Sequence, residues 1–297
     1  MHLTLKDLRK GFENVGYICD EETILTVYLS LVLEKPILIE GPPGVGKTEM
    51  GKVLSQIFDT ELIRLQCYEG LDENKALYEW NYQKQLLKIQ INRDNAETNE
   101  LENDLFSPEY LLERPLLKAI QSPRKVVLLV DEIDKSDDEF EAFLFELLSD
   151  FQVSVPELGT IRANHIPIVV LTSNSERELS DGLKRRCIFL YLDFPGIERE
   201  VEIIRAKVPQ AGENLTKEIA KAVNLIRQNA EIRKKPSIAE TLDWTRALVS
   251  LNKDRLQSST IELTLNLLLK NRADQRVFHE QIGAKALREN SRAGISR

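Results

Sequence analysis

Short apolar runs alternate with helical repeats of apolar residues along the first two thirds of the chain. Five runs are typical of buried strands, and they cover residues 36–40, 61–67, 125–132, 166–174 and 187–193. Helical spacing predicts helices at residues 4–14, 20–34, 47–58 and 137–149, the second of them with Asp20 as its N-cap. This alternation predicts an α/β fold in which helices cover both faces of a mostly parallel sheet.

The strand pattern ends near Pro195, and only helical patterns follow. The predicted helices cover residues 197–207, 215–229, 237–250, 259–270 and 273–289. We therefore expect an α/β core over residues 1–194 and a smaller, all-helical domain over residues 195–297.

Two segments of the core do not fit simple βα alternation. After the strand at 61–67, the pattern predicts a long helical stretch with a hydrophilic interruption at 92–104, and a helix begins again near Ser107. Tyr78, Trp80 and Tyr82 recur at spacing two there, but aromatic side chains of a helix packed on the sheet explain them equally well. Residues 152–162 alternate around a turn at 156–159 and predict a β-hairpin.

Composition narrows the class of protein. A hydrophobic content of 42% with 30% charged residues is ordinary for a soluble globular protein. The pattern shows no signal peptide and no apolar run long enough to span a membrane, so we expect a cytoplasmic protein without membrane insertion. Cys19, Cys67 and Cys187 have no metal-ligand spacing, which favours reduced and mostly buried thiols.

The net charge of −8 is unevenly distributed along the chain. Residues 1–194 carry 21 basic and 35 acidic side chains, whereas residues 195–297 carry 19 basic and 13 acidic ones. An acidic core argues against extensive sequence-independent binding of nucleic acid, because such binding needs many basic side chains to neutralise phosphates. The opposite charges suit head-to-tail contacts between copies, although a solvated surface explains them at least as well.

A phosphate-binding loop stands between the first predicted strand of the sheet and the helix that follows. Residues 41–48, GPPGVGKT, match the pattern G-x-x-x-x-G-K-[ST] in that context. Glycines let backbone N–H groups surround phosphates, a lysine reaches the β- and γ-phosphates, and a threonine hydroxyl ligates Mg²⁺. A chance glycine-rich turn is the alternative. The residues predicted to bind ATP are Gly41, Pro42, Pro43, Gly44, Val45, Gly46, Lys47, Thr48 and Glu49.

An acid pair closes the most apolar of the predicted strands. Asp131 and Glu132 follow directly after it, and the carboxyl ends of strands in such a sheet face the ligand. Asp131 suits Mg²⁺, mainly through the water shell of the ion, and Glu132 is placed to deprotonate the attacking water. The alternative is an N-cap pair for the next helix. Together with Thr48 as the second metal ligand, the pair predicts a hydrolase that uses ATP and Mg²⁺.

These motifs and their order resemble the AAA+ ATPases, specifically the MoxR-type group. GPPGVGKT is followed by LLVDEIDK (128–135), a hairpin, LTSN (171–174) and LKRRC (183–187). The resemblance implies a P-loop NTPase core with a helical lid domain. It also implies that Asn174 acts as sensor 1, holding the attacking water. Arg186, or Arg185 beside it, would be an arginine finger that acts on the ATP of a neighbouring copy, so the protein would form a homo-oligomer, by family expectation a hexameric ring.

Other family features correspond less clearly. A sensor 2 arginine is expected where Ala239 stands, and Lys235 or Arg246 could substitute. Residues 68–106 would contain an elaboration of helix 2, or an ordinary surface loop, and residues 152–162 the hairpin before sensor 1. In ring motors of this kind both elements line the central opening.

Within the group, four segments look like the CoxD branch: residues 67–72, 78–82, 106–120 and 235–244. CoxD-like proteins are associated with maturation of the metal centre of carbon monoxide dehydrogenase and related molybdenum hydroxylases, with a partner that carries a von Willebrand factor A domain. The resemblance thus implies a remodelling chaperone for a metalloenzyme client. Three alternatives remain: an activase of the rubisco or nitric oxide reductase type, a DNA-associated motor, and a nucleotide-gated scaffold.

Overall fold

The computed structural model describes residues 3–91, 107–155 and 159–293. The chain divides into two compact units. The first contains residues 1–11, 21–41 and 47–191, and the second contains residues 12–20, 42–46 and 192–297. The second unit thus includes two short segments from the predicted core, and the predicted domains at 1–194 and 195–297 stay a prediction.

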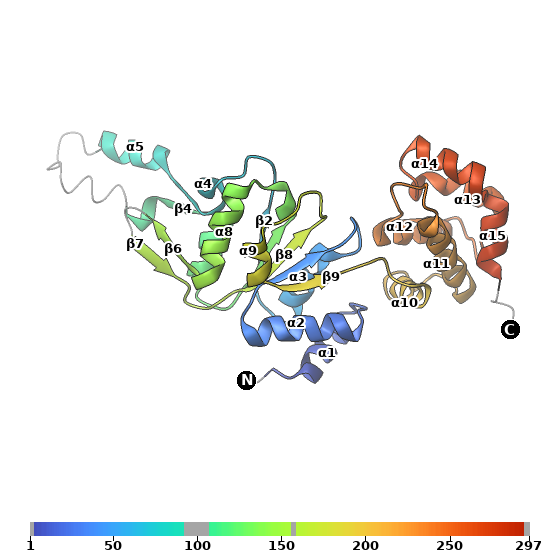
Figure 1. The fold of residues 1–297 in the computed structure, drawn as a ribbon, viewed down its shortest axis with the longest axis horizontal. Helices are drawn as coiled ribbons and strands as arrows, with labels where there is room; N and C mark the ends of the chain where they lie inside the picture. Colours follow the sequence, from blue (N-terminus) through green and yellow to red (C-terminus); the bar gives the residue numbers. More distant parts are fainter. Residues whose placement is uncertain (1–2, 92–106, 156–158, 294–297) are drawn as a thin grey trace. The chain divides into compact units, whose positions relative to one another are not determined.

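The first unit is built on a five-stranded parallel sheet (Figure 1). The strands are β1 (Ile37–Glu40), β2 (Leu62–Gln66), β5 (Val127–Asp131), β8 (Ile168–Ser173) and β9 (Ile188–Tyr191). Their order across the sheet is β2-β5-β8-β1-β9. The predicted fold class is confirmed, because each predicted strand of the core is present and all pair in parallel.

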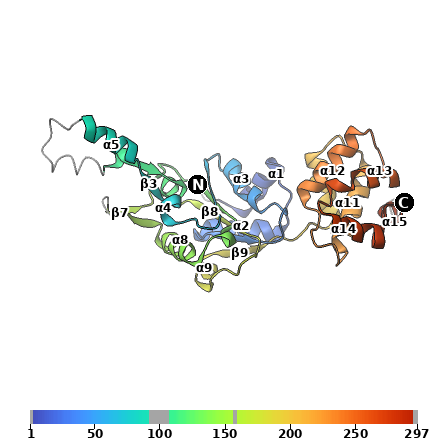
Figure 2. The ribbon, with the colours of Figure 1, turned by 90° about the horizontal axis from the view of Figure 1, so that it is seen from above.

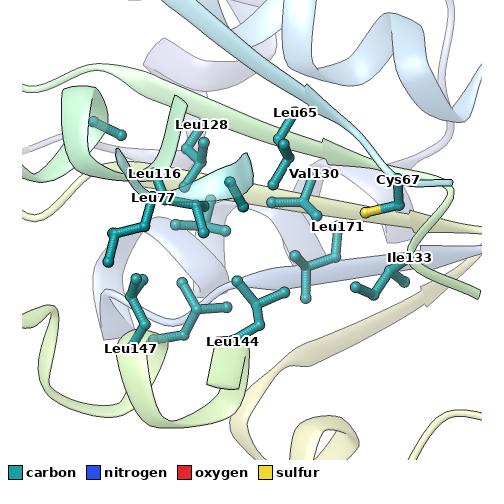
Figure 3. Close-up of a cluster of buried hydrophobic side chains, with 14 of the residues drawn as sticks. Leu65, Cys67, Leu77, Leu116, Leu128, Val130, Ile133, Leu144, Leu147 and Leu171 are labelled. Atoms are coloured by element: carbon teal, nitrogen blue, oxygen red, sulfur yellow. The ribbon is translucent and has the colours of Figure 1, made fainter. Parts of the chain in front are cut away.

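Helices cover both faces of this sheet. They include α1 (Leu5–Asn14), α2 (Glu21–Leu33), α3 (Lys47–Ile57), α7 (Pro115–Gln121), α8 (Asp138–Asp150) and α9 (Asp181–Arg186). Successive side chains of β5 point to opposite faces of the sheet, as in any pleated strand. Leu128 and Val130 join the buried cluster that contains Leu116 and Leu144 of α7 and α8 (Figure 3). Leu129, between them, packs against Gly51 of α3.

The segment after β2 differs from the prediction of a long helix. It contains a short α4 (Glu73–Ala76), strand β3 (Tyr78–Trp80) and helix α5 (Tyr82–Ile91). β3 pairs antiparallel with β4 (Leu111–Glu113), so the spacing of two between Tyr78 and Trp80 is that of a strand. Both views place α5 at one end of the first unit (Figures 1 and 2). The interruption predicted at 92–104 lies outside the described residues.

The helix predicted from near Ser107 onward is also wrong in its extent. A 3₁₀ turn η1 (Pro108–Tyr110) and β4 occupy its first half, and α7 begins only at Pro115. Proline lacks a backbone N–H and is accepted in the first turn of a helix but not in its interior. The chain can therefore extend into a strand before Pro115 and start a new helix at it.

The hairpin predicted at 152–162 has both of its strands. β6 (Gln152–Val155) and β7 (Gly159–Arg162) pair antiparallel, with Gln152 opposite Arg162. The turn at 156–158 lies outside the described residues.

The second unit has an apolar core of its own, and helices contribute most of its residues. These helices are α10 (Ile197–Lys207), α11 (Glu213–Gln228), α12 (Ile238–Ser250), α13 (Ser258–Thr264), α14 (Arg272–Val277) and α15 (Ala284–Arg292). The helix predicted at 259–270 ends earlier and continues as the 3₁₀ turn η3 (Leu265–Leu267). The helix predicted at 273–289 is divided by the π-helical turn η4 (Phe278–Ile282) and by Gly283 at φ 69°. Glycine adopts this left-handed conformation readily, so the chain changes direction there.

Among the described residues, no helix combines the length and the apolar content that a membrane span requires.

Candidate active site

The phosphate-loop sequence connects β1 to α3, as the motif requires. Gly44 and Gly46 have φ of 78° and 97°, a region that side chains disfavour, so glycine is needed at both positions. The carbonyl of Gly44 accepts a hydrogen bond from the N–H of Ile238 within the second unit (3.1 Å). Lys47 begins α3 and is buried, and its Nζ donates to the carbonyl of Gly41 at 2.6 Å. The loop lysine thus bonds to the loop itself.

Asp131 forms hydrogen bonds with side chains from three other elements of the first unit. It is the last residue of β5 and is only 2% exposed. Its Oδ1 accepts the hydroxyls of Thr48 (2.9 Å) and Thr172 (2.6 Å), and its Oδ2 accepts Nη2 of Arg64 (2.5 Å). Thr48 and Asp131 are 83 positions apart in the chain, and the parallel register of the sheet brings them to one edge.

The oxygens of Thr48 and Asp131 suit a hard divalent cation. Mg²⁺ prefers oxygen ligands and is usually held through one or two carboxylates while it keeps several waters. A hydroxyl and a carboxylate oxygen that already lie 2.9 Å apart can share the ion and its water shell. Mg²⁺ bound there would neutralise negative charge on phosphate oxygens.

Glu132 has a strained backbone. Its φ of 57° and ψ of 52° lie in the left-handed region, which is rare for residues other than glycine. Its N–H donates to Oγ1 of Thr172 (2.9 Å), which fixes the residue to the adjacent strand β8. Its Oε2 accepts Nε2 of Gln66 (2.9 Å) and Nζ of Lys135 (2.7 Å). This side chain is 34% exposed, whereas that of Asp131 is 3% exposed, so only the glutamate is open to a water molecule.

Asn174 follows the end of β8, and a buried carboxylate holds its backbone. Oδ2 of Asp134 accepts the N–H groups of Asn174 and Glu176, both at 3.0 Å. Asp134 is 4% exposed, and its Oδ1 has no hydrogen-bond partner among the described residues. Asn174 itself is partly exposed.

The two candidate finger arginines lie at the end of α9, just before β9. Both Arg185 and Arg186 are exposed, and the Arg186 guanidinium lies 5.2 Å from the ring centre of Phe145 in α8. Within the described part of the chain, no hydrogen bond or ion pair joins either arginine to the acid pair. The structure therefore does not bring these two residues into the cluster around Asp131.

The candidates for sensor 2 have local partners in the second unit. Nζ of Lys235 donates to the carbonyl of Asn229, and Arg246 pairs with Asp243 on the exposed side of α12 (2.9 Å). Ala239, at the expected position, is exposed.

Negative charge dominates the surroundings of the acid pair. Burial lowers the pKa of Lys47, and the carboxylates of Asp134, Asp131, Glu132 and Glu40 partly oppose that shift. Burial raises the pKa of Cys67 to about 12, and three of the same carboxylates add to the rise. Cys67 is therefore an uncharged buried thiol. The excess of carboxylates favours a bound cation.

Supporting residues of the site were missed in the sequence, among them Gln66 and Thr172, which bond to the acid pair, and Asp134, which holds the backbone of Asn174. Each is a polar residue at, or just beyond, the carboxyl end of an apolar strand. This position at the end of a strand is the sequence signal that could have identified them as site residues.

A phosphate loop after β1 and an acid pair after β5, with β8 between these two strands of a parallel sheet, define a P-loop protein with the AAA+ fold. The sequence model of the AAA domain (dynein-related subfamily) matches residues 36–187, which is just over half of the chain. The chain therefore belongs to this family of AAA domains.

The chain is also similar to several other proteins and solved structures. An uncharacterized protein of Staphylococcus aureus (strain bovine RF122 / ET3-1) is 24% identical over 229 residues, covering 74% of this chain and 77% of that protein. Replication factor C subunit 1 of Oryza sativa subsp. japonica is 24% identical over 240 residues, but the match spans 20% of its length. The fold is similar to the RuvB K64R mutant of Thermotoga maritima, with a TM-score of 0.51 and 18% identity over 92% of this chain and 73% of that one. The RuvB Holliday junction branch migration motor of Thermotoga maritima gives a TM-score of 0.50 at 17% identity, with 92% and 73% coverage.

Proposed function

We propose that the protein is a magnesium-dependent ATP hydrolase. The supporting observation is the hydrogen bond between Thr48 and Asp131, with Glu132 directly after Asp131 in the chain. In this proposal residues 41–49 bind the phosphates, Lys47 exchanges the Gly41 carbonyl for the β- and γ-phosphates, and Thr48 and Asp131 hold Mg²⁺.

Glu132 is the proposed general base. It would take a proton from the attacking water while Asn174 orients that water. Its carboxylate is the more exposed of the acid pair, and Asp134 anchors the backbone of Asn174. Gln66 and Lys135 both donate to Oε2 of Glu132, so Oε1 is the oxygen proposed to accept the proton.

Arg186, or Arg185 beside it, would stabilise the charge that develops on the phosphoryl group in a neighbouring copy. Both are exposed and lie apart from the acid cluster of their own chain, which suits action in trans. This role requires a homo-oligomer, and we propose a hexameric ring.

The finer proposal is a MoxR-type, CoxD-like remodelling chaperone that matures or activates a molybdenum hydroxylase, with a von Willebrand factor A-domain partner. The segments at 67–72, 78–82, 106–120 and 235–244 support it. An activase that removes inhibitors from another enzyme shares the same ATP chemistry. A DNA motor is the rival that the names of RuvB and replication factor C suggest, but the acidic first 194 residues argue against it.

One set of assays separates these functions. We expect ATP turnover that Mg²⁺ removal abolishes and that duplex or branched DNA leaves unchanged. Stimulation of ~10-fold or more by DNA would favour the motor, because such a rise requires a tight phosphate contact. No turnover, with or without a purified von Willebrand factor A-domain partner, would overturn the hydrolase and leave a nucleotide-gated scaffold. Stable co-purification of the Glu132→Gln variant with that partner and a molybdenum hydroxylase is the expected result for the chaperone.

A further inference from the structure

The loop between Asn174 and Ser180 is anchored at both ends by buried carboxylates. At its start, Asp134 accepts the N–H groups of Asn174 and Glu176. At its end, Oε1 of Glu141 accepts the N–H of Ser180 at 2.6 Å. Asp134 and Glu141 both belong to the short stretch that runs from the acid pair into α8.

Glu141 is a costly residue at its position. It is 2% exposed, and burying a carboxylate is unfavourable unless it is paired and hydrogen-bonded. Its Oε2 pairs with Nη2 of Arg177 at 2.8 Å, and Nη1 of Arg177 also reaches Asp138 at the start of α8 (2.8 Å). An apolar residue would pack α8 without this cost. The bonds of Glu141 therefore serve the loop and helix α9 after it.

Ser180 is the residue that starts α9. Its Oγ accepts the N–H of Leu183 at 3.3 Å as the N-cap. Because Glu141 holds the N–H of this same residue, it determines where α9 begins on the surface of α8. At the other end of α9, Arg186 lies over the ring of Phe145, one helical turn after Glu141 in α8.

Both ends of α9 are thus fixed to one helix, and that helix begins just after the acid pair. A six-residue helix has little stability of its own, so its direction depends on such anchors. The pair of Glu141 with Arg177 is the anchor that specifies direction, because the geometry of ion pairs and hydrogen bonds is narrower than that of apolar contacts.

We propose that Glu141 is a positioning residue, which acts through Ser180 and Arg177 to set the direction in which α9 presents Arg185 and Arg186 to a neighbouring copy of this chain. The inference rests on the proposed function, because it assigns an anchor to the arginine finger. Glu141 would not touch nucleotide, and its effect would be felt in the site of the adjacent subunit.

Mixed assemblies test this assignment. Glu141→Ala subunits keep their own phosphate loop and acid pair, whereas Lys47→Ala subunits keep their own α9. Glu141→Ala alone should lower kcat by ~10-fold or more, with nucleotide affinity within ~3-fold of the parent, because positioning errors reduce the rate rather than binding. Mixing the two variants should restore turnover at interfaces that combine an intact site with an intact α9.

Matched variants separate positioning from damage to the fold. Glu139→Gln removes an exposed carboxylate of the same helix and should leave turnover unchanged. Arg177→Met removes the ion pair but leaves the hydrogen bond between Glu141 and Ser180. If Glu141→Ala does not fold, Arg177→Met takes its place in the mixing experiment. Arg177→Lys keeps the positive charge and should therefore keep part of the activity that Arg177→Met loses.

Two outcomes would overturn the inference. The first is turnover of ATP by Glu141→Ala at the parent rate. The second is a folded Glu141→Ala or Arg177→Met variant whose turnover does not recover when Lys47→Ala subunits are added. Restoration of Arg186→Ala by Lys47→Ala in parallel shows that the finger acts in trans. If that reference mixture also fails while the parent hydrolyses ATP, the proposed finger is wrong as well. A parent without turnover refutes the hydrolase itself.

Discussion

Buried charges in the two units of the protein have different surroundings. In the second unit, Arg227 forms two hydrogen bonds with Glu200, at 2.6 and 2.9 Å, and donates from Nε to the carbonyl of Pro236 at 2.8 Å. Both side chains are at most 5% exposed, and the ring of Phe194 lies 4.6 Å from the guanidinium. This pair joins α10, α11 and the segment before α12, and neither side chain has a buried nitrogen or oxygen without a hydrogen-bond partner.

The buried charges around the acid pair of the first unit are less fully bonded than this pair. Oδ1 of Asp134 has no partner within the described residues, and Lys47 bonds to a carbonyl of its own loop. Asp131 and its neighbours form an excess of carboxylates around that lysine. Such groups can exchange partners when a charged ligand arrives, whereas the pair of the second unit cannot do so without breaking the fold. We therefore interpret the first set of charges as functional and the second as structural.

Replacement of the loop lysine is the strongest way to test this contrast. Lys47→Ala should weaken ATP binding by ~100-fold or more, since it removes the cation proposed for the β- and γ-phosphates. Its melting temperature should change little, because burial of the ammonium group is itself unfavourable. Titration with a fluorescent ATP analogue and a thermal melt measure both. Lys118→Ala, on the exposed side of α7, is the control, and unchanged affinity in Lys47→Ala would contradict the proposed cradle.

Replacement of the proposed base should separate binding from hydrolysis. Glu132→Gln should lower kcat by ~10²- to 10⁴-fold with ATP binding retained, because an amide cannot accept the proton of the attacking water. Single-turnover kinetics and binding of the analogue measure the two effects. Turnover of Glu132→Gln at the parent rate would show that another group is the base.

Glu200→Ala should act on stability rather than on chemistry. Removing one member of a buried pair leaves Arg227 charged and unpaired, which costs ~3–5 kcal/mol of the free energy of unfolding. Urea denaturation followed by circular dichroism measures the loss. A double variant, Glu200→Leu with Arg227→Met, should recover most of it. A loss below ~1 kcal/mol in the single variant would place this pair with surface ion pairs and remove the contrast between the units.

A smaller and pH-dependent effect is expected at Asp274 of α14. Burial would raise its pKa, but the N–H groups of Arg233 and Lys234 and the amide of Asn271 hold the pKa below its usual range. A lowered pKa in the folded state stabilises the fold above the unfolded pKa of ~4, and that contribution is lost as the pH falls through the folded value. Asp274→Asn should cost ~1–3 kcal/mol at neutral pH.

The difference in unfolding free energy between Asp274→Asn and the parent should shrink as the pH is lowered from about 5 to 3. Denaturation at several pH values measures it. A difference that stays constant over this range would show that the charge of Asp274 contributes nothing.

Local sequence patterns predicted most of the first unit. The five apolar runs became the five strands, and the three central ones, β5, β8 and β1, are buried on both faces, where a parallel strand needs apolar residues. The segment around Tyr78 was mispredicted because β3 has only three residues, too few for periodicity to distinguish a strand from a helix. Its partner β4 lies more than thirty residues away, and pairing over that distance leaves no local signal.

The supports of the site were harder to find. Thr172 is fully buried inside the run IVVLTS and looks like an ordinary strand residue until the register places it beside Asp131. Glu141 looks like one of several acids in α8, since its burial depends on the loop from another strand.

The sequence by itself determined the βα alternation, the phosphate-loop motif and the acid pair, because each depends on residues that are close together in the chain. Only the tertiary structure decided the strand order β2-β5-β8-β1-β9, the left-handed backbone of Glu132 and the partners of Asp131. These features require contacts between residues that are tens of positions apart. Such contacts arise only when the chain buries its apolar strands together, and the burial of the whole sheet compensates for the local cost of the strained glutamate.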